Sequence, residues 1–136
     1  MRIFLDANIL FSGAKTDGAI RRMLLLLARA GHECWVDGYV VEEARRNLAA
    51  KAPDCLLVME TLLSRMHRAA TQSSAIPPAF MRALPEKDRP VLAAAIRLEC
   101  EALVTGDSTH FGPLFGKAFG GVTVYSPSLL AQKLLR

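Results

Sequence analysis

The chain has 136 residues, of which 51% are hydrophobic and 22% charged, which predicts one folded domain over residues 1–136 and excludes a disordered chain. No apolar run approaches the roughly 18 residues that a membrane-spanning helix needs. The segment after Met1 lacks the regions of a signal peptide, and the three cysteines include no C-x-x-C pair, so reduced core thiols are expected. Together these features predict a cytoplasmic protein.

The net charge is positive. Seventeen Lys and Arg residues against thirteen Asp and Glu give a formal net charge of +4. Twelve of the seventeen are Arg, the residue better suited to bidentate contact with phosphate. This balance permits a polyanionic partner such as a nucleic acid, but an ordinary solvated surface explains it equally well.

In chain order, the first predicted elements are a strand, a loop and a helix. The apolar run Arg2–Leu5 is typical of a buried parallel strand. Residues Ala7–Thr16 contain Asn, Ser and Gly and predict a loop. The strongly apolar segment Ala19–Ala30 predicts a helix, with Asp17 as its N-cap and Gly31 at its end.

The middle of the chain continues the alternation. Residues Glu33–Asp37 predict a second strand, and Tyr39–Lys51 predict a helix with apolar residues at helical spacing. A further helix is predicted from Asp54 to about His67, followed by a short strand over Arg68–Gln72. The next segment, Ser73–Pro85, holds three prolines and predicts a loop with a helical turn around Phe80.

The last predicted elements are a helix, two strands and a terminal helix, over Asp88–Cys100, Ala102–Thr105, Val122–Tyr125 and from Pro127 onwards, the last with Ser126 as its cap. Strands that alternate with helices indicate a parallel sheet covered on both faces. We therefore predict an α/β protein with a three-layer α/β/α arrangement and a central parallel sheet of four to five strands.

Two of the predicted strands are followed by an aspartate. Asp6 follows Arg2–Leu5, and Asp107 follows Ala102–Thr105 after one glycine. Ligands of open parallel sheets bind outside the carboxyl ends of the strands, so neighbouring strands would bring both carboxylates to one crevice. Two carboxylates that close repel, which favours a hard divalent cation such as Mg²⁺ or Mn²⁺ between them. The alternative is that each aspartate only caps the element that follows.

Two further acids are candidates for the same crevice. Glu43 borders the apolar face of its helix, where a carboxylate needs a partner or a cation, although an ordinary surface glutamate is as good an interpretation. Asp88 precedes Pro90 in the first turn of a helix and is a predicted N-cap. A carboxylate has enough lone pairs to cap a helix and bind a metal together.

These motifs resemble those of PIN domains, the nuclease family that includes the VapC toxins. The segment Leu5-Asp6-Ala7-Asn8-Ile9-Leu10 resembles the opening motif of that family. Glu43 matches the family's helical glutamate, Asp88 its third acidic position, and Thr105-Gly106-Asp107 its strand-end motif. The likeness extends over essentially the whole chain, with the motifs in family order.

The resemblance implies a sheet with its first and fourth strands adjacent, and hydrolysis of RNA phosphodiester bonds with Mg²⁺ or Mn²⁺. The implied metal ligands and catalytic residues are Asp6, Glu43, Asp88 and Asp107. A toxin of this type would have a protein antitoxin as its partner, and homodimers are common in the family. Cleavage by such a site would leave a 5′-phosphate and a 3′-hydroxyl.

The chain also departs from the family pattern. His110 stands where many members carry a further acid, and Ala7 stands where Ser or Thr is frequent. A histidine there can contact phosphate or bind a metal, although a loop histidine without a role is commoner. Among supporting residues, Thr105 could orient a ligand, and Asn8 could hold the loop after Asp6 through bonds to the backbone.

Two other functions deserve comparison with the nuclease. The first is a catalytically idle PIN-like module that holds RNA or a protein in the same cleft. The second is a phosphatase or phosphate receiver with Asp6 as its nucleophile. The sequence disfavours the second, because no aspartate follows Asp6 two residues later and no suitably placed lysine follows a strand.

Overall fold

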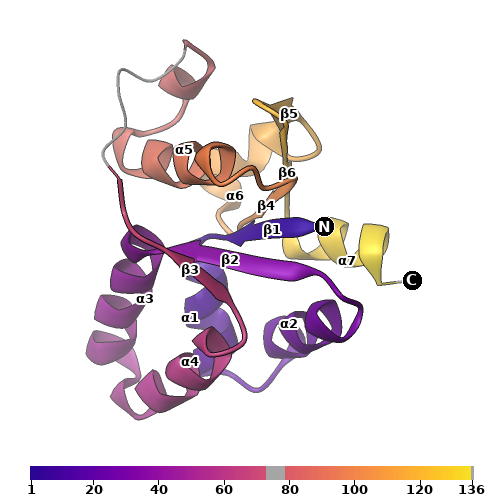
Figure 1. Ribbon diagram of the computed structural model, residues 1–136. Coiled ribbons are helices and arrows are strands. Elements are labelled where there is room, and N and C mark those ends of the chain that lie inside the picture. The colour runs from indigo at the N-terminus through magenta and orange to yellow at the C-terminus, as the bar shows by residue number, and fades with distance from the viewer. Residues whose placement is uncertain (73–78, 136) are drawn as a thin grey trace.

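The computed structural model describes residues 1–72 and 79–135, and a mixed sheet forms the middle of this part of the chain (Figure 1). The sheet order is β3-β2-β1-β4-β6-β5. Its strands are β1 (Arg2–Leu5), β2 (Glu33–Asp37), β3 (His67–Ala69), β4 (Ala102–Val104), β5 (Ala118–Phe119) and β6 (Val122–Tyr125). All neighbouring pairs are parallel except β5 with β6. The predicted parallel sheet is confirmed, with one more strand than expected.

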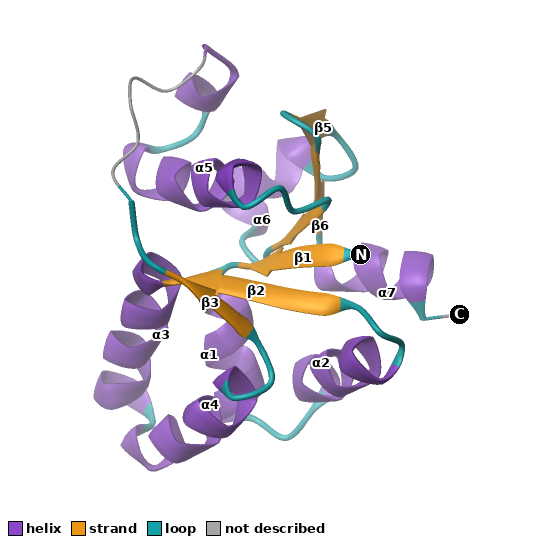
Figure 2. Cartoon of the chain, in the orientation of Figure 1, coloured by secondary structure: helices purple, strands orange, loops and turns teal. Residues whose placement is uncertain are grey.

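Helices cover both faces of the sheet (Figure 2). Helices α1 to α4 lie on one face and α5 lies on the other, which confirms the three-layer architecture. The helices are α1 (Ala7–Lys15), α2 (Ala19–Arg29), α3 (Gly38–Lys51), α4 (Leu56–Leu63), α5 (Arg89–Arg97), α6 (Ser108–Phe111) and α7 (Pro127–Leu134). None of the helices in the described residues is both long and apolar enough to cross a membrane.

The central strands are buried on both sides, as their apolar sequences predict. Ile3, Phe4 and Leu5 of β1 are fully buried, and so are all residues of β4. In the register of these two strands Leu5 lies opposite Val104. The backbone N–H of Asp6 then donates to the carbonyl of Val104 at 3.1 Å. The carboxyl ends of β1 and β4 therefore lie side by side, which confirms the predicted adjacency of the first and fourth strands.

The predicted loop over Ala7–Thr16 is wrong, because this segment is helix α1. Its apolar residues recur at helical spacing and are buried against α3, α4 and α2. Gly13 permits close packing with α2, since a Cβ on it would lie 3.1 Å from Leu24 Cδ1. Asp17 is not the N-cap of α2 either. Gly18 occupies that position, and Asp17 forms an ion pair with Arg21 at 3.8 Å.

Two boundaries in the middle of the chain also differ from the prediction. The helix expected to reach His67 ends at Leu63, because His67 begins β3 and pairs with Trp35 of β2. The strand expected over Arg68–Gln72 is therefore shifted towards the N-terminus and shorter. The predicted helical turn around Phe80 is confirmed as the 3₁₀ helix η2 (Ala79–Ala83), whereas positions 73–78 of the predicted loop lie outside the described residues.

Strand β5 was not predicted. It forms a hairpin with β6 in which Phe119 pairs with Val122. The two loop residues, Gly120 and Gly121, have φ angles of 58° and 85°. Two consecutive glycines with positive φ are typical of a tight two-residue hairpin turn, so the pair was a signal for this hairpin.

Candidate active site

Asp6 occupies the end of β1 and is only 5% exposed. Its Oδ1 accepts a hydrogen bond from the backbone N–H of Ala7 at 2.7 Å, at the start of α1. Its Oδ2 accepts from the Thr105 hydroxyl at 2.7 Å and from Asn8 Nδ2 at 3.2 Å. Both carboxylate oxygens are therefore held by neighbouring groups, and the carboxylate has one defined orientation.

The surroundings of Asp6 disfavour its charge. The pKa of Asp6 is raised from 3.8 to about 6, mainly by burial and to a smaller extent by the nearby charges of Glu43 and Asp88. The hydrogen bonds from Thr105 and Ala7 act in the opposite direction. The structure thus brings three of the four predicted acids close enough to repel one another, which is the condition that favours a bound cation.

Thr105 and Asn8 link the ends of β1 and β4. The Thr105 hydroxyl donates to Asp6 and accepts from Asn8 Nδ2 at 3.2 Å and from the backbone N–H of Asp107 at 3.1 Å. A hydroxyl has one donor and two acceptor sites, so Thr105 has none left for a ligand. Asn8 Oδ1 accepts from the backbone N–H of Gly106 at 2.8 Å. Asn8 therefore reaches across to the other strand instead of holding its own loop.

Helix α3 carries Glu43 and a residue that the sequence analysis missed, Tyr39. These two residues are one turn apart on the same helix face, which was the available signal. The Tyr39 hydroxyl donates to the carbonyl of Lys87 at 2.6 Å, directly before Asp88. Burial raises the pKa of Tyr39, and so do the charges of Glu43, Asp88 and Asp6. Tyr39 therefore lies within the acidic cluster and connects α3 with the segment that carries Asp88.

Asp37 is a third strand-end aspartate, but it has a structural partner. Its side chain accepts from the backbone N–H of Val40 at 3.1 Å and caps α3. Arg97 of α5 lies 3.7 Å from its Oδ2. Burial raises its pKa, while these two partners lower it. Asp37 thus fixes the start of the helix that presents Tyr39 and Glu43 to the site.

Asp88 and Asp107 meet at His110. His110 Nδ1 lies 2.7 Å from Asp88 Oδ2 and 2.9 Å from Asp107 Oδ2. Asp107 is the N-cap of the short helix α6, and its Oδ1 accepts from the backbone N–H of His110 at 3.0 Å. Asp88 also occupies an N-cap position, that of α5, but its side chain makes no capping hydrogen bond. Asp88 is thus the predicted N-cap residue by position, but its carboxylate faces His110 and makes no cap.

These side chains fit a divalent cation. Asp88, Asp107 and His110 each offer one ligand atom, and the three atoms lie within 4.8 Å of one another. Asp88 Oδ2 and His110 Nδ1 are buried and lack a hydrogen-bond partner among the residues that the structure describes. Buried polar atoms without partners are unfavourable, and a cation with oxygen and nitrogen ligands would satisfy both.

Arginines near the site differ in their availability for phosphate. Arg45 is engaged by Glu42 at 3.4 Å and Glu60 at 3.0 Å. Arg89 donates to the carbonyls of Leu84 at 3.0 Å and Arg82 at 3.4 Å. Arg46 is exposed, and its charge lowers the pKa of Tyr39, so it lies close to the acidic cluster. Of the three arginines, Arg46 is best placed to approach a substrate.

The order and geometry of the acidic residues agree with a comparison of the sequence with family models. The model described as "PIN domain" matches residues 2–109. The chain belongs to the PIN domain family. No curated protein matches it in sequence.

Solved structures similar to this PIN domain include chains of two VapBC complexes. One is VapBC2 from Rickettsia felis bound to a DNA fragment from its promoter, with a TM-score of 0.70 and 16% sequence identity. The other is DNA-bound VapBC from Salmonella typhimurium, with a TM-score of 0.67 and 16% identity. Both matches cover 93% of this chain and 98% of the other chain. The TM-scores show that the fold is shared, and at 16% identity the likeness shows nothing beyond the fold.

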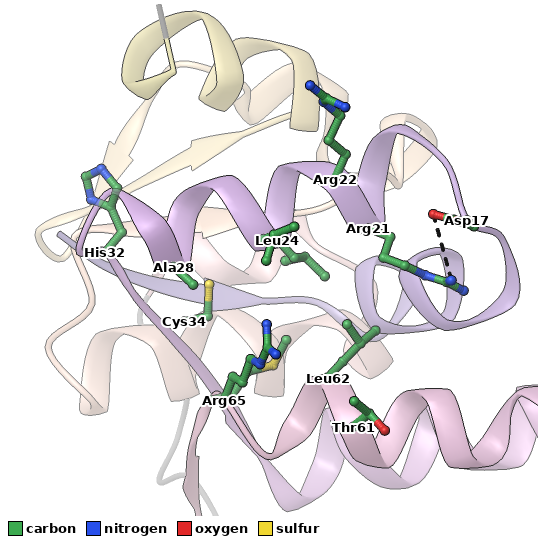
Figure 3. A pocket seen from close by; sticks show the side chains of 12 residues that line it. Asp17, Arg21, Arg22, Leu24, Ala28, His32, Cys34, Thr61, Leu62 and Arg65 are labelled. Carbon is green, nitrogen blue, oxygen red and sulfur yellow. Dashed lines mark ion pairs between the residues drawn. The ribbon is translucent and has the colours of Figure 1, made fainter.

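A pocket of about 350 Å³ in this PIN domain lies apart from the acidic cluster of Asp6, Glu43, Asp88 and Asp107, between α2 and α4 (Figure 3). Its apolar lining includes Leu24, Leu25, Ala28, Leu62 and Met66. Basic side chains also line it, namely Arg21, Arg22 and Arg65. We call it the α2–α4 pocket. None of the four predicted catalytic acids lines it, so it is a second feature of the surface with a different character.

Proposed function

We propose that this PIN domain is a divalent-metal-dependent ribonuclease and the toxin of a VapBC-type pair. The main support is the convergence of Asp6, Glu43, Asp88 and Asp107 at the carboxyl ends of β1 and β4. These acids come from four separate parts of the chain, and the burial of Asp6 makes their mutual repulsion costly without a cation. Membership of the PIN family and the fold shared with chains of VapBC complexes support the same assignment.

In this proposal the four acids hold one or two Mg²⁺ or Mn²⁺ ions. A metal held there would supply an activated water and would stabilise the charge that develops on the oxygens of the phosphodiester. Thr105, Asn8 and the N–H of Ala7 keep the Asp6 carboxylate in one orientation. The bond from Tyr39 to Lys87 keeps Asp88 beside α3, and Arg46 meets the RNA backbone. The expected products carry a 5′-phosphate and a 3′-hydroxyl.

The test is cleavage of labelled single-stranded RNA by the purified protein with Mn²⁺, with Mg²⁺ and with EDTA. Cleavage should require a metal and should fall by at least about a hundredfold in Asp6→Asn, because a ligand with a fixed orientation is lost. Asp54→Asn is the matched control, since Asp54 is an exposed acid outside the cluster. Cleavage that persists in EDTA, or that survives in Asp6→Asn, would contradict the proposal.

The alternative is a catalytically idle module that holds RNA or a protein in the same cleft. The same purified protein distinguishes the two functions. RNA binding that is unaffected by Asp6→Asn, together with no cleavage by wild type under any metal, would favour the idle module.

We also propose that the α2–α4 pocket receives a segment of a protein antitoxin. Its apolar lining suits the buried face of an amphipathic segment, and its arginines suit acidic residues on the rim of that segment. Arg22 and Arg65 form no ion pair within residues 1–72 and 79–135, so both are free for such a partner. A homodimer stays a prediction, which sedimentation of the isolated protein would measure.

A further inference from the structure

The imidazole of His110 lies at the point where two elements of the site meet. Asp107 caps α6, and one helical turn brings His110 back over it, with Nδ1 2.9 Å from the Asp107 carboxylate. Asp88, from the start of α5, approaches the same nitrogen at 2.7 Å. His110 is therefore built into the cluster and is not a free loop residue.

The close contacts of Nδ1 are not hydrogen bonds. Both Nδ1 and Asp88 Oδ2 are buried without a hydrogen-bond partner in the described part of the chain. An octahedral metal with ligands at about 2.1 Å places adjacent ligand atoms about 3 Å apart. The separations of 2.7 Å and 2.9 Å are close to that spacing, so the three atoms are arranged like ligands of one ion.

We propose that His110 is a nitrogen ligand of the metal and makes this site select a first-row transition ion over Mg²⁺. The proposal rests on the metal-dependent function proposed above and adds the identity of the ion. Mg²⁺ prefers oxygen ligands and keeps much of its water, whereas imidazole suits Mn²⁺, Co²⁺ and Zn²⁺ progressively better. A histidine in place of a carboxylate therefore weakens Mg²⁺ binding and strengthens binding of transition ions.

A different role for His110 predicts the opposite result. If the ring served as a cation that neutralises Asp88 and Asp107, it would compete with every metal. Its removal would then strengthen the binding of Mg²⁺ and of transition ions alike. Metal affinities of His110 variants distinguish the two roles without any measurement of catalysis.

The experiment measures the binding of Mg²⁺, Mn²⁺ and Co²⁺ to the full chain by calorimetry after removal of metal with EDTA. The variants are His110→Ala, which deletes the ligand, and His110→Asp, which replaces it with oxygen. The control is His67→Ala. His67 is an exposed histidine of β3, and its ring stacks on Trp35 of β2 with 4.7 Å between the ring centroids. Thermal melting in EDTA checks that each variant folds, and the two His110 variants provide independent tests. The visible absorption of bound Co²⁺ reports the ligand set directly.

We expect His110→Ala to weaken Co²⁺ binding by at least about tenfold, to change the Co²⁺ spectrum, and to leave Mg²⁺ binding nearly unchanged. His110→Asp should lower the preference for Co²⁺ over Mg²⁺ by a similar factor, and His67→Ala should behave as wild type. Tighter binding of all ions by His110→Ala, or an unchanged preference in both variants, would overturn the ligand role.

Cleavage of RNA in the same samples separates this inference from the proposed function. Metal-dependent cleavage with an unchanged ion preference in both variants would leave the ribonuclease intact and remove the ligand role of His110. A changed preference and spectrum without cleavage by any protein would support His110 as a ligand and remove the ribonuclease.

Discussion

At the scale of single residues, the main feature of this PIN domain is a carboxylate placed where its charge is unfavourable. Asp6 is buried beside Glu43 and Asp88, and its pKa is raised from 3.8 to about 6 by burial and by those charges. The three hydrogen bonds to its oxygens reduce this cost without removing it. The groups around Asp6 therefore compensate its negative charge only in part.

The raised pKa of Asp6 predicts how the stability of the metal-free protein depends on pH. The unfolded chain loses the proton near 3.8 and the folded protein near 6, so the contribution of Asp6 to stability decreases as pH rises between these values. The rise from 3.8 to about 6 corresponds to roughly 3 kcal/mol, at about 1.4 kcal/mol for each pKa unit. Asp6→Asn lacks this titration and should not lose this stability. Its free energy of unfolding relative to wild type should therefore increase between pH 3.8 and about 6 and then level off.

Urea denaturation in EDTA at several pH values measures this difference. The readout is how the difference in the free energy of unfolding between Asp6→Asn and wild type changes with pH. Hydrogen bonds altered by the Asn amide shift this difference by the same amount at every pH. The exposed Asp54→Asn serves as the control and should give a flat difference. Parallel pH profiles for Asp6→Asn and wild type would contradict the raised pKa.

At the scale of elements, helices α2 and α5 are each followed by a residue with a left-handed backbone conformation, but the residue type differs. In α2, Gly31 has a φ of 84°, and the N–H of His32 donates to the carbonyl of Leu27 at 3.0 Å. In α5, the equivalent residue is Glu99 with a φ of 56°, and the N–H of Cys100 donates to Ala95 at 3.0 Å. This left-handed position favours glycine, so Glu99 is strained where Gly31 is not.

We therefore expect Glu99→Gly to stabilise the protein by about 0.5–1 kcal/mol, since relief of the left-handed strain exceeds the added entropy of the unfolded chain. Glu99 is exposed and lies beyond the C-terminal end of α5, whereas Asp88 lies at its N-terminal end, so cleavage should not change. Glu99→Ala removes the same charge but keeps a Cβ, and it should have little effect. Thermal and urea unfolding measure both variants, and an equal gain for Ala and Gly would assign the effect to charge instead of backbone strain.

Most elements could be predicted from the sequence because their signals are local. The apolar runs of β1, β4 and β6 and the Ser126 cap of α7 were sufficient for those elements. Helix α1 was missed because its polar and small residues have tertiary roles: Asn8 bonds to the end of β4, and Gly13 allows α2 to approach. Strand β3 was misplaced because its residues show no alternation and its position depends on pairing with β2.

The acidic residues of the candidate site could be predicted from the sequence. The contacts between the side chains of the site could not. Strand-end positions identified Asp6 and Asp107 because the carboxyl ends of parallel strands form binding sites. The saturation of the Thr105 hydroxyl depends on the register of β1 with β4, which no local pattern encodes. The contact of His110 with Asp88 likewise joins residues from two separate helices. The sequence alone therefore indicated the candidate site residues. The structure adds which residues hold the others in position.

At the scale of the whole molecule, the two surface features have opposite electrostatic character. The acidic cluster lies at the carboxyl ends of the strands, whereas the α2–α4 pocket includes His32 and Cys34 from the beginning of β2. An RNA backbone needs cations to approach the first, and an acidic protein segment is attracted by the second. A partner in the pocket would therefore leave the acidic cluster untouched unless another part of the partner extends to it.

This arrangement predicts that antitoxin binding and metal binding respond to different substitutions. Arg22→Glu and Arg65→Glu reverse two charges that line the pocket and should weaken binding of a VapB-type antitoxin by at least about tenfold. Arg68→Glu on β3 is the charge-matched control, because Arg68 is exposed and outside the pocket lining.

Dissociation constants measured at two salt concentrations complete this test. The loss in the pocket variants should be smaller at high salt, where charges are screened, while Asp6→Asn should bind the antitoxin as wild type does. If Arg68→Glu weakened binding as much as the pocket variants, the attraction would come from overall charge and not from the α2–α4 pocket. If only Asp6→Asn lost binding, the antitoxin would act at the acidic cluster itself.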